Sequence, residues 1–441
     1  MKKEIVKPSI LPGFMELLPY QQIAFNNMLD TIRKNFENYG FLPIDTPIIE
    51  KSEILLAKGG GETEKQIYRF NKGDNDLSLR FDLTVPLARY VSQYISSLTF
   101  PFRRYQIGKV FRGERNQKGR FREFYQCDID IIGNGKLNII NDAEIPSIIY
   151  STFKDLGFES FSIRINNRKV LNGFFDSLGI ADKSEVLKVI DKLDKTGIDA
   201  VKKELADICE NGNIVEKIIE FVNIGGSNPE ILEALNQLGI ENEMFKEGLE
   251  ELSKVVRFIN LFGVPDKNCK IDLKIARGLD YYTGTVYETI LDDYPGIGSV
   301  CSGGRYDNLA EYYTDQKLPG VGISIGLTRL FYQLREAGIV LDKDTASLTQ
   351  VLIVPMNDNI EYAAMTANSL RAESIITEVY MEDAKLSKKL AYANKLGIPY
   401  VILIGDEEID NNLLTLKDMR VGEQNKLSPE EAVRHIKEGL L

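Results

Sequence analysis

Apolar residues recur at helical spacing near the start of the chain. They occupy positions 25, 28, 29, 32, 36 and 39, which predicts an amphipathic helix over residues 20–39 that ends at Gly40. The next segment, FLPIDTPIIE, is predicted to be extended, because Pro43 and Pro47 do not fit a helix interior. The glycine-rich segment KGGGETE, residues 58–64, is predicted to be a flexible loop, either a mobile lid or a linker.

The pattern changes to strict alternation over residues 104–132, which predicts a long antiparallel hairpin with the tip NQKG. The return arm RFREFYQCDIDII alternates. One face carries Tyr125, Cys127, Ile129 and Ile131, and the other carries Arg122, Phe124, Gln126, Asp128 and Asp130. Such a polar face is costly to bury unless it binds something. The alternative is a face open to solvent, which antiparallel sheets often have.

Helical patterns then fill residues 169–258, in segments that end at or near glycine or asparagine. Strand patterns resume with KIDLKIARGLDYYTGTVYETIL, so the sheet is predicted to combine segments from both sides of a helical insertion. After the polar linker LDKDTASLTQ, the strands VLIVPM, ITEVYM and PYVILIG with helices between them predict a separate α/β domain. Ser428, Pro429 and Glu431 mark the start of its last helix.

The composition excludes several kinds of chemistry. The chain has 441 residues, which favours two or three domains. It has one histidine, His435, and four cysteines whose spacing matches no zinc or disulfide framework. This argues against a histidine triad or a histidine-ligated metal cluster. Because no apolar run is long enough for a membrane span or a secretory signal, we expect a cytoplasmic protein with no membrane contact.

Basic side chains are concentrated in one segment of an acidic chain. The formal net charge is −11, which by itself argues against bulk attraction to nucleic acid. Residues 103–122 nevertheless carry eight basic side chains and one acidic side chain, Glu114. This strip is either a solvated charged hairpin or a site for polyphosphate, RNA or both.

Four short segments resemble motifs of class II aminoacyl-tRNA synthetases. The first is LRFDLTVPLARY (79–90), and the second, FRGERNQKGRFREFYQCDID (111–130), is similar to motif 2. The third, ARGLDYYTGTVYE (276–288) with CSGGRYDNL (301–309), resembles two peptides peculiar to the histidyl-tRNA synthetase family. The fourth, GVGISIGLTRL (320–330), is similar to motif 3. A lone FRxE is a weak signal, whereas all four segments in this order are a strong one.

The resemblance implies an α+β fold. It would have a class II antiparallel catalytic sheet of six or seven strands with a helical insertion, followed by a C-terminal α/β anticodon-binding domain. The implied domains are the first catalytic part with motifs 1 and 2 (1–168), the helical insertion (169–258), the second catalytic part (259–337) and the anticodon-binding domain (347–441). The resemblance also implies a homodimer.

The implied activity is that of a ligase which activates L-histidine with ATP and Mg²⁺ and transfers it to the 3′ end of tRNA(His). Activation is attack by the amino-acid carboxylate on the α-phosphorus of ATP, so the substrate supplies its own nucleophile. The protein must hold two anions together and neutralise the charge on the phosphorus. Arginine suits this task, because it is always charged and binds phosphate oxygens with two donors.

By resemblance, four arginines and one glutamate belong to the ATP site. The two catalytic residues would be Arg112, which contacts the α-phosphate and the amino-acid carboxylate, and Arg277, which contacts the α-phosphate. Arg120 would reach the terminal phosphates, and Arg329 would stack on adenine and touch phosphate. Glu114 would hold the adenine and the metal-bound phosphates. An isolated arginine usually belongs to a surface ion pair, but four at motif positions favour function.

The histidine site calls for groups that attract the substrate's ammonium and ring. Asp82 and Thr84 are predicted on one strand face, and Gln126 and Asp130 on another. Tyr306 and Asp307 either serve the pocket or shape it. The histidine-binding positions that the resemblance implies are Asp82, Thr84, Gln126, Asp130, Tyr281 and Tyr282.

Three other functions compete with this one. The main alternative is a non-catalytic paralogue that acts as the regulatory subunit of ATP phosphoribosyltransferase. Such proteins generally lack the C-terminal domain and several signature residues, which are present here. The second is a synthetase-like module that senses uncharged tRNA, and the third is a synthetase for threonine, proline or glycine. The peptides around Arg277 and Arg305 argue against the third.

Overall fold

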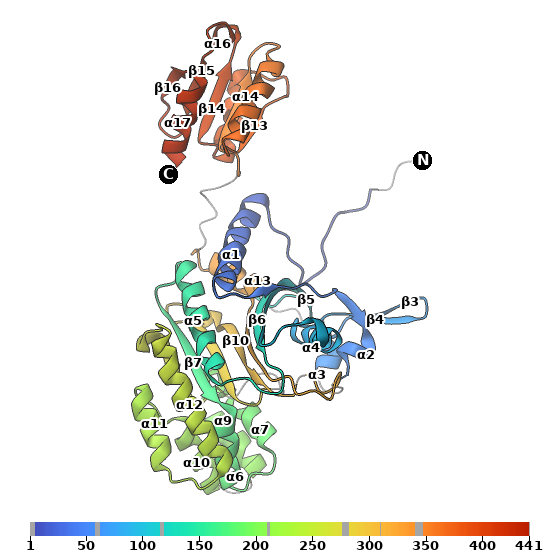
Figure 1. Cartoon of the computed structure of the whole chain (residues 1–441), viewed down its shortest axis with the longest axis vertical. Helices are drawn as coiled ribbons and strands as arrows, with labels where there is room; N and C mark the ends of the chain where they lie inside the picture. Colours follow the sequence, from blue (N-terminus) through green and yellow to red (C-terminus); the bar gives the residue numbers. More distant parts are fainter. Residues whose placement is uncertain are drawn as a thin grey trace. The chain divides into compact units, whose positions relative to one another are not determined.

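The computed structural model describes residues 5–57, 62–114, 119–209, 212–275, 282–308, 310–339 and 347–440. It contains two compact units, Met1–Met15 with Met28–Glu336 and Glu16–Asn27 with Ala337–Leu441 (Figure 1). Arg277, Tyr281 and the loop residues 58–61 lie outside the described residues. The helix predicted over residues 20–39 is α1 (Pro19–Asn38).

An eight-stranded sheet forms the centre of the first unit, in the order β1-β5-β6-β11-β10-β9-β7-β8. Its six inner strands are antiparallel: β5 (Phe102–Phe111), β6 (Glu123–Ile132), β11 (Gly320–Ile325), β10 (Ser299–Tyr306), β9 (Thr285–Leu291) and β7 (Phe161–Asn167). The edge strands β1 (Leu42–Pro43) and β8 (Cys269–Ile271) pair in parallel with their neighbours. The expected count of six or seven strands is therefore too low within the described residues, because these very short strands carry no alternation of their own.

The predicted hairpin is β5 and β6, which pair from Phe102 opposite Ile132 to Phe111 opposite Glu123. On one face of β6 the apolar side chains are fully buried. On the other face Gln126, Asp128 and Asp130 are only 8%, 2% and 4% exposed. The alternative of a solvent-facing polar side is therefore wrong. Both faces of this strand are covered, and one of them is charged.

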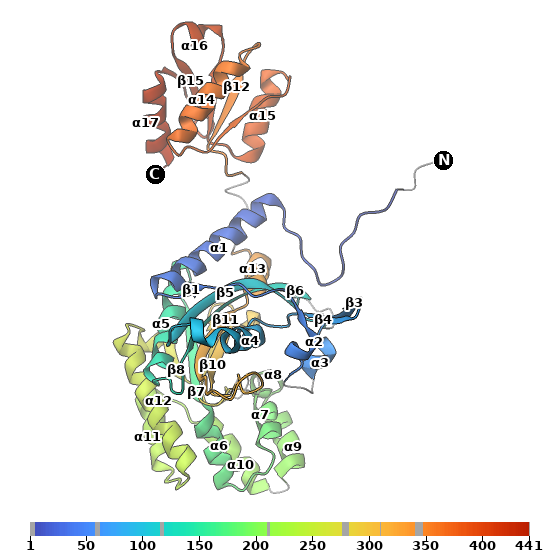
Figure 2. The ribbon, with the colours of Figure 1, turned by 45° about the vertical axis from the view of Figure 1, so that its right-hand side comes forward.

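Helices cover the sheet and fill the insertion (Figure 2). Around the sheet lie α4 (Thr84–Tyr94), α5 (Ile140–Asp155) and α13 (Leu327–Glu336). A small sheet in the order β2-β4-β3 precedes them, formed by β2 (Ile49–Lys51), β3 (Arg69–Lys72) and β4 (Asn75–Leu79), with the short helices α2 (Ser52–Leu55) and α3 (Glu62–Gln66). The insertion contains α6 (Arg168–Ser177), α7 (Lys183–Ile190), α8 (Leu193–Thr196), α9 (Ile198–Cys209), α10 (Gly212–Val222), α11 (Asn228–Gln237) and α12 (Glu243–Leu261).

The second unit has a five-stranded sheet in the order β13-β12-β14-β15-β16. The predicted strands are β12 (Val351–Pro355), β13 (Thr377–Val379) and β14 (Tyr400–Ile404), which pair in parallel. The antiparallel strands β15 (Leu414–Asp418) and β16 (Gln424–Leu427) were not predicted. Its helices are α14 (Ile360–Ala372), α15 (Leu386–Leu396), α16 (Asp406–Asp410) and α17 (Pro429–Leu440).

The predicted start of the last helix is confirmed. Ser428 donates its backbone N–H to the Glu431 carboxylate at 2.9 Å, and its hydroxyl accepts the backbone N–H of Glu431 at 3.3 Å. This is the reciprocal capping arrangement that the sequence predicted. Among the helices that the structure describes, none has the length and apolarity needed to cross a membrane.

Candidate active site

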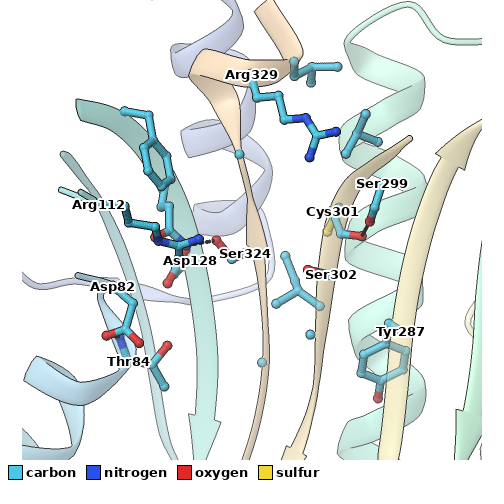
Figure 3. Close-up of a pocket in the computed structure, with 18 of the residues that line it drawn as sticks. Asp82, Thr84, Arg112, Asp128, Tyr287, Ser299, Cys301, Ser302, Ser324 and Arg329 are labelled. Carbon is cyan, nitrogen blue, oxygen red and sulfur yellow. Dashed lines mark hydrogen bonds between the residues drawn. The ribbon is translucent and has the colours of Figure 1, made fainter. Parts of the chain in front are cut away.

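A cavity of about 450 Å³ lies against the charged face of the eight-stranded sheet (Figure 3). Its volume is in the range of small-molecule sites. It brings together residues from Asp82 to Leu330, which are 248 positions apart in the chain. The predicted site residues that line it are Asp82, Thr84, Arg112, Glu114, Arg120, Gln126, Asp130, Tyr282 and Arg329. The other two predicted residues, Arg277 and Tyr281, fall outside the described ranges.

The prediction that Asp82 and Thr84 share a strand face is wrong. Thr84 is the first residue of α4, and Asp82 lies just before it. Asp82 Oδ1 accepts the backbone N–H groups of Thr84 at 3.2 Å and Val85 at 2.9 Å, which have no partner inside the helix. The alternation in LRFDLTVP suggested a strand, but an aspartate shortly before Pro86 is also a helix-start signal. Burial raises the pKa of Asp82, and the nearby Arg112 opposes that rise.

Asp130 is tied to two buried neighbours on the floor of the cavity. It forms an ion pair with the fully buried Arg104, and Tyr306 donates its hydroxyl to Asp130 Oδ1 at 2.7 Å. Burial raises the pKa of Asp130 to about 6, although Arg104 and the Tyr306 hydroxyl favour the ionised form. Tyr306 therefore shapes the site through Asp130. Asp307 also has a structural partner, because it accepts the hydroxyl of Thr283 at 2.5 Å.

Asp128 and Gln126 have unused acceptors at the cavity wall. Gln126 Nε2 donates to Ser324 Oγ at 2.6 Å. Within the described part of the chain, Gln126 Oε1 and Asp128 Oδ1 are buried and accept no hydrogen bond. Burial raises the pKa of Asp128 to about 7, and Arg104 opposes this. Buried acceptors normally find a donor, so these two atoms fit a ligand that carries N–H groups.

Strand register explains why the cavity forms here. Asp130 lies opposite Gly322 of β11, which lies opposite Gly304 of β10. A Cβ on Gly322 would lie 2.3 Å from Asp130 Oδ1, so any larger residue would collide with the carboxylate. One step along, Asp128 lies opposite Ser324. Small residues beside the carboxylates therefore leave room for a ligand above the sheet.

Arginines line the cavity above these carboxylates. The guanidinium of Arg112 lies over the Phe81 ring at 4.4 Å and over the Phe124 ring at 5.1 Å, and its Nε donates to the Phe81 carbonyl at 3.2 Å. Arg329, in the first turn of α13, donates to the carbonyl of Ile297 at 3.1 Å. In Figure 3, Arg112 lies between Arg329 above and Asp82 below. The cavity thus offers positive groups next to negative ones.

Glu114 and Arg120 lie at the stems of the hairpin tip. Arg120 Nη1 is 3.4 Å from Glu114 Oε2, and both side chains line the cavity. In the described ranges no cluster of three or more histidine, cysteine, aspartate or glutamate side chains could hold a metal ion. A metal ion at this site would therefore depend on ligands from a substrate, with at most a carboxylate from the chain.

Several residues in or beside the cavity were not among the predicted site residues. Alternation placed Asp128 on the same face as Gln126 and Asp130, and this was the signal that could have identified it. Ser324 and Ser302 also line the cavity. Arg104 was counted as part of the basic strip, but it is buried beneath the floor beside Asp130. Its contact depends on strand pairing, which spacing along the chain does not reveal.

Comparison with known proteins identifies the family. Residues 13–330 match the family model described as histidyl-tRNA synthetase. The chain belongs to the histidyl-tRNA synthetase family. Residues 350–439 match a second model, described as an anticodon-binding domain. The predicted fold class, with a class II sheet and a C-terminal anticodon-binding domain, is therefore confirmed.

Similar proteins support the same conclusion over the whole chain. The histidine–tRNA ligase of Clostridium tetani is 68% identical over 437 residues, which are 99% of this chain and 100% of the relative. The crystal structure of histidyl-tRNA synthetase from Nostoc sp. PCC 7120 superposes with a TM-score of 0.90 at 42% identity, and covers 99% of this chain and 100% of its own.

The main alternative function is not supported. A Bacillus halodurans structure titled as an ATP phosphoribosyltransferase regulatory subunit/histidyl-tRNA synthetase has a TM-score of 0.75 at 20% identity, covering 91% of this chain and 99% of its own. At that identity the likeness shows the fold alone. The relatives of higher identity confirm the prediction of a ligase of the histidyl-tRNA synthetase family. The chain therefore does not belong to the synthetase families for threonine, proline or glycine.

Proposed function

We propose that the cavity is where L-histidine is activated with ATP to histidyl-adenylate, before the histidyl group passes to the 3′ end of tRNA(His). One observation carries this assignment. A single cavity holds three arginines, Arg112, Arg120 and Arg329, beside buried carboxylates on the sheet. The arginines suit the phosphates of ATP and the carboxylate of the amino acid, and the buried carboxylates suit its ammonium group.

The arginines divide the ATP site between them. Arg112, held by two aromatic rings and the Phe81 carbonyl, would contact the α-phosphate and the histidine carboxylate. Arg329 would stack on adenine, and Arg120 would reach the terminal phosphates. We assign Arg277 to the α-phosphate from its motif position alone. Because the substrate carboxylate is the nucleophile, the chain needs no general base, and its task is to orient two anions and stabilise charge on the phosphorus.

Mg²⁺ would bind together with ATP. This ion keeps several water ligands and usually takes one or two protein carboxylates plus substrate phosphates. Glu114 beside Arg120 fits that requirement, as the carboxylate nearest the proposed position of the terminal phosphates. When bound, the ion would add positive charge at the phosphates.

The histidine site lies on the sheet. Gln126 Oε1 and Asp128 Oδ1 would accept N–H groups of the substrate, since they have no donor among the described residues. Asp82, just before α4, would add negative charge. Asp130, which forms an ion pair with Arg104, would also add negative charge. Thr84 and Tyr282 would complete the wall, with Tyr281 assigned from its motif position. Paired polar groups of this kind reject analogues that lack the ring nitrogens, because the buried acceptors would stay unpaired.

The other partners follow from the family. The unit that matches the anticodon-binding model would bind tRNA(His), and the cytoplasm is where that substrate occurs. We also propose a homodimer. Leu42, Ile48, Ile49 and Phe70 are exposed apolar side chains in the segment before the hairpin, which suits a protein interface. Analytical ultracentrifugation of the purified chain tests this.

Amino-acid-dependent exchange between ATP and pyrophosphate tests the function. The assay should be run with each of the twenty amino acids, and histidine should support exchange with the highest kcat/KM. If another amino acid exceeds it, the substrate assignment is wrong. If none supports exchange in a folded protein, the proposed activity is wrong.

A further inference from the structure

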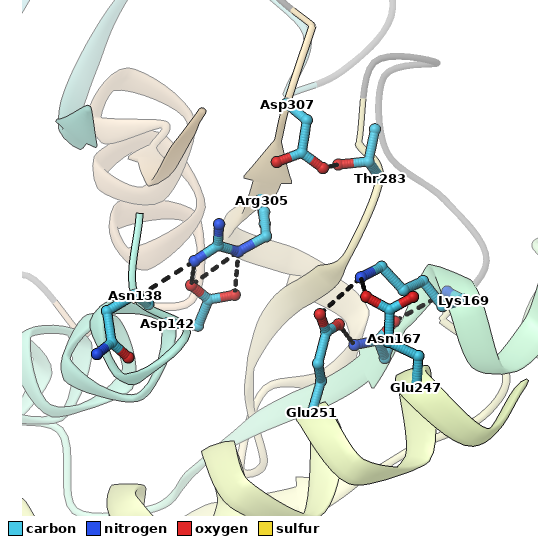
Figure 4. Close-up of polar contacts among 9 residues, drawn as sticks. All are labelled: Asn138, Asp142, Asn167, Lys169, Glu247, Glu251, Thr283, Arg305 and Asp307. Atoms are coloured by element: carbon cyan, nitrogen blue, oxygen red, sulfur yellow. Dashed lines mark hydrogen bonds and ion pairs between the residues drawn. The ribbon is translucent and has the colours of Figure 1, made fainter. Parts of the chain in front are cut away.

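The sheet face opposite the cavity carries a second buried charged group (Figure 4). Arg305 lies near the end of β10, and Asp142 lies in the first turn of α5. Arg305 Nη2 is 2.6 Å from Asp142 Oδ1, and Arg305 Nε lies 3.1 Å and 3.0 Å from the two carboxylate oxygens. Asp142 is fully buried and Arg305 nearly so, and neither lines the cavity.

The pair ties several elements to one carboxylate. Arg305 Nη2 also donates to the carbonyl of Asn138 at 3.3 Å, just before α5. The hydroxyl of Tyr287 in β9 donates to the backbone carbonyl of Asp142 at 2.6 Å. Strands β9 and β10 and helix α5 are therefore joined at this point. A buried ion pair contributes little net stability, because desolvation offsets the attraction, but its geometry is directional.

Arg305 also holds the segment that leads to Tyr282. Its backbone carbonyl accepts the N–H of Thr283 at 2.9 Å. Its side chain passes close to Gly284, where an added Cβ would lie 2.9 Å from Arg305 Cδ. The neighbouring Thr283 hydroxyl donates to Asp307 at 2.5 Å. The path of residues 282–284 is therefore set by the end of β10.

Two cavity tyrosines depend on this stretch. A Cβ on Gly304 would lie 2.9 Å from Tyr282 Cδ1, so the Tyr282 ring rests directly against the strand backbone. Tyr306 follows Arg305 on the opposite face of β10 and donates to Asp130. A shift of β10 would therefore move both tyrosine side chains relative to Asp130 and the cavity wall.

We propose that the Arg305–Asp142 pair is a positioning element for amino-acid recognition, which holds Tyr282 and Tyr306 at the histidine end of the cavity from the opposite face of the sheet. This inference rests on the proposed function of the cavity. The pair acts through β10 and touches no substrate. Among the contacts of the described residues, none joins the Arg305–Asp142 pair to the ATP end of the cavity, formed by Arg112, Arg120 and Arg329.

The test compares Michaelis constants in pyrophosphate exchange. We expect Asp142→Asn and Arg305→Met to raise the KM for histidine roughly tenfold or more, because small displacements of positioning groups are costly. The KM for ATP should change less than about twofold. A purely structural role would reduce the amount of active enzyme and leave both constants unchanged. Circular dichroism and thermal unfolding monitor the fold.

Two further variants complete the experiment. Arg305→Lys keeps the positive charge but loses the two-donor contact with Asp142, and should raise the histidine KM in the same direction by a smaller factor. Glu144→Gln is the matched control, since Glu144 is on the same helix and pairs with Arg103 at 2.8 Å. It should leave both constants unchanged.

The outcomes separate this inference from the proposed function. If the unmodified chain shows no histidine-dependent exchange, the proposed function fails. If it does, and folded Asp142→Asn and Arg305→Met proteins keep the parental histidine KM, the inference alone is overturned. If both fail to fold, an unchanged histidine KM in Arg305→Lys overturns it, and a selectively raised one supports it.

Discussion

The two large sheets of the molecule bury different kinds of side chain. In the second unit, four successive residues of β12, Val351–Val354, are fully buried and pack alternately into two apolar cores, one on each side of the sheet. In the first unit, β6 has one apolar face and one face with Gln126, Asp128 and Asp130. Burial raises the pKa of Asp128 to about 7 and that of Asp130 to about 6.

The apolar sheet contributes mainly to stability, whereas the charged face of the other sheet lowers stability and suits binding. Burying apolar side chains stabilises a fold, whereas burying carboxylates destabilises it unless a cation or donor compensates. In β6, Arg104 compensates Asp130. Asp128 Oδ1 has no hydrogen-bond donor among the described residues, and a stability cost of this kind is typical of functional residues. The charged sheet should therefore respond to mutation mainly in activity, and the apolar unit mainly in stability or tRNA binding.

The largest expected effect is that of Arg112→Ala. We expect pyrophosphate exchange to fall roughly 10²- to 10³-fold, the loss seen when one preorganised charge-stabilising donor is removed. Arg420→Ala is the control, because Arg420 also lies over an aromatic ring, that of Tyr400 at 4.8 Å, but belongs to the second unit. It should destabilise that unit and spare exchange. Similar exchange losses in the two variants would contradict the comparison.

The next effect is that of deleting residues 347–441. Exchange should persist, since the described cavity residues all lie in the first unit. Aminoacylation of tRNA should fall roughly 10²-fold, because one of two linked binding contacts is lost. Both reactions are assayed on the same preparation, with its size checked by sedimentation. Near-full aminoacylation would refute the anticodon-binding role of the unit.

Sequence patterns predicted the parts of the fold whose signals are local. Alternation predicted the β5–β6 hairpin, and continuous apolar runs predicted β12 and β14. The segment FLPIDTPIIE, predicted to be extended, contains β1, and the predicted strand pattern from Lys270 begins within β8. The parallel pairing of these short strands at the edges of the sheet was not predicted, because it depends on contacts far apart in the chain. The strands β15 and β16 were missed because their segments, LTLKD and QNKL, are short and polar at one end.

The sequence also predicted many of the residues of the candidate site. Motif resemblance gave nine residues that line one cavity. It placed Asp82 in a strand, because alternation and a helix start look alike in LRFDLTVP. It did not identify Arg104 or the Arg305–Asp142 pair, since both depend on contacts between segments far apart in the chain.

Asp130→Asn sharpens the comparison within the charged face. We expect only a small change in the free energy of unfolding, because the loss of the charged partner of Arg104 opposes the gain from removing a carboxyl whose pKa burial raises to about 6. It should also raise the KM for histidine much more than the KM for ATP. Urea unfolding and pyrophosphate exchange measure the two effects. Equal changes in both Michaelis constants would contradict the assignment of Asp130 to the histidine end.

Asp128→Asn should stabilise the folded chain, by an amount that depends on pH. The unfolded chain loses the Asp128 proton near the ordinary aspartate pKa of about 4, whereas the folded chain keeps it until about 7. Between these values the folded state binds more protons, so the carboxyl makes the parent less stable as pH rises. The variant lacks this cost. We expect its gain to be near zero at pH 4, to grow towards pH 7 and to stay constant above it, at up to about 4 kcal/mol.

Histidine should bind more tightly to the parent than to Asp128→Asn, although the variant is the more stable protein. The ionised Asp128 attracts the substrate ammonium, so parental affinity should weaken as pH falls through about 7. The imidazole of free histidine titrates in the same range, but it does so equally for both proteins. The ratio of parental to Asp128→Asn affinity, measured by calorimetry from pH 5.5 to 8.5, therefore isolates Asp128. We expect that ratio to be largest above pH 7 and to approach one at pH 5.5. A ratio independent of pH would show that the Asp128 charge has no part in binding histidine.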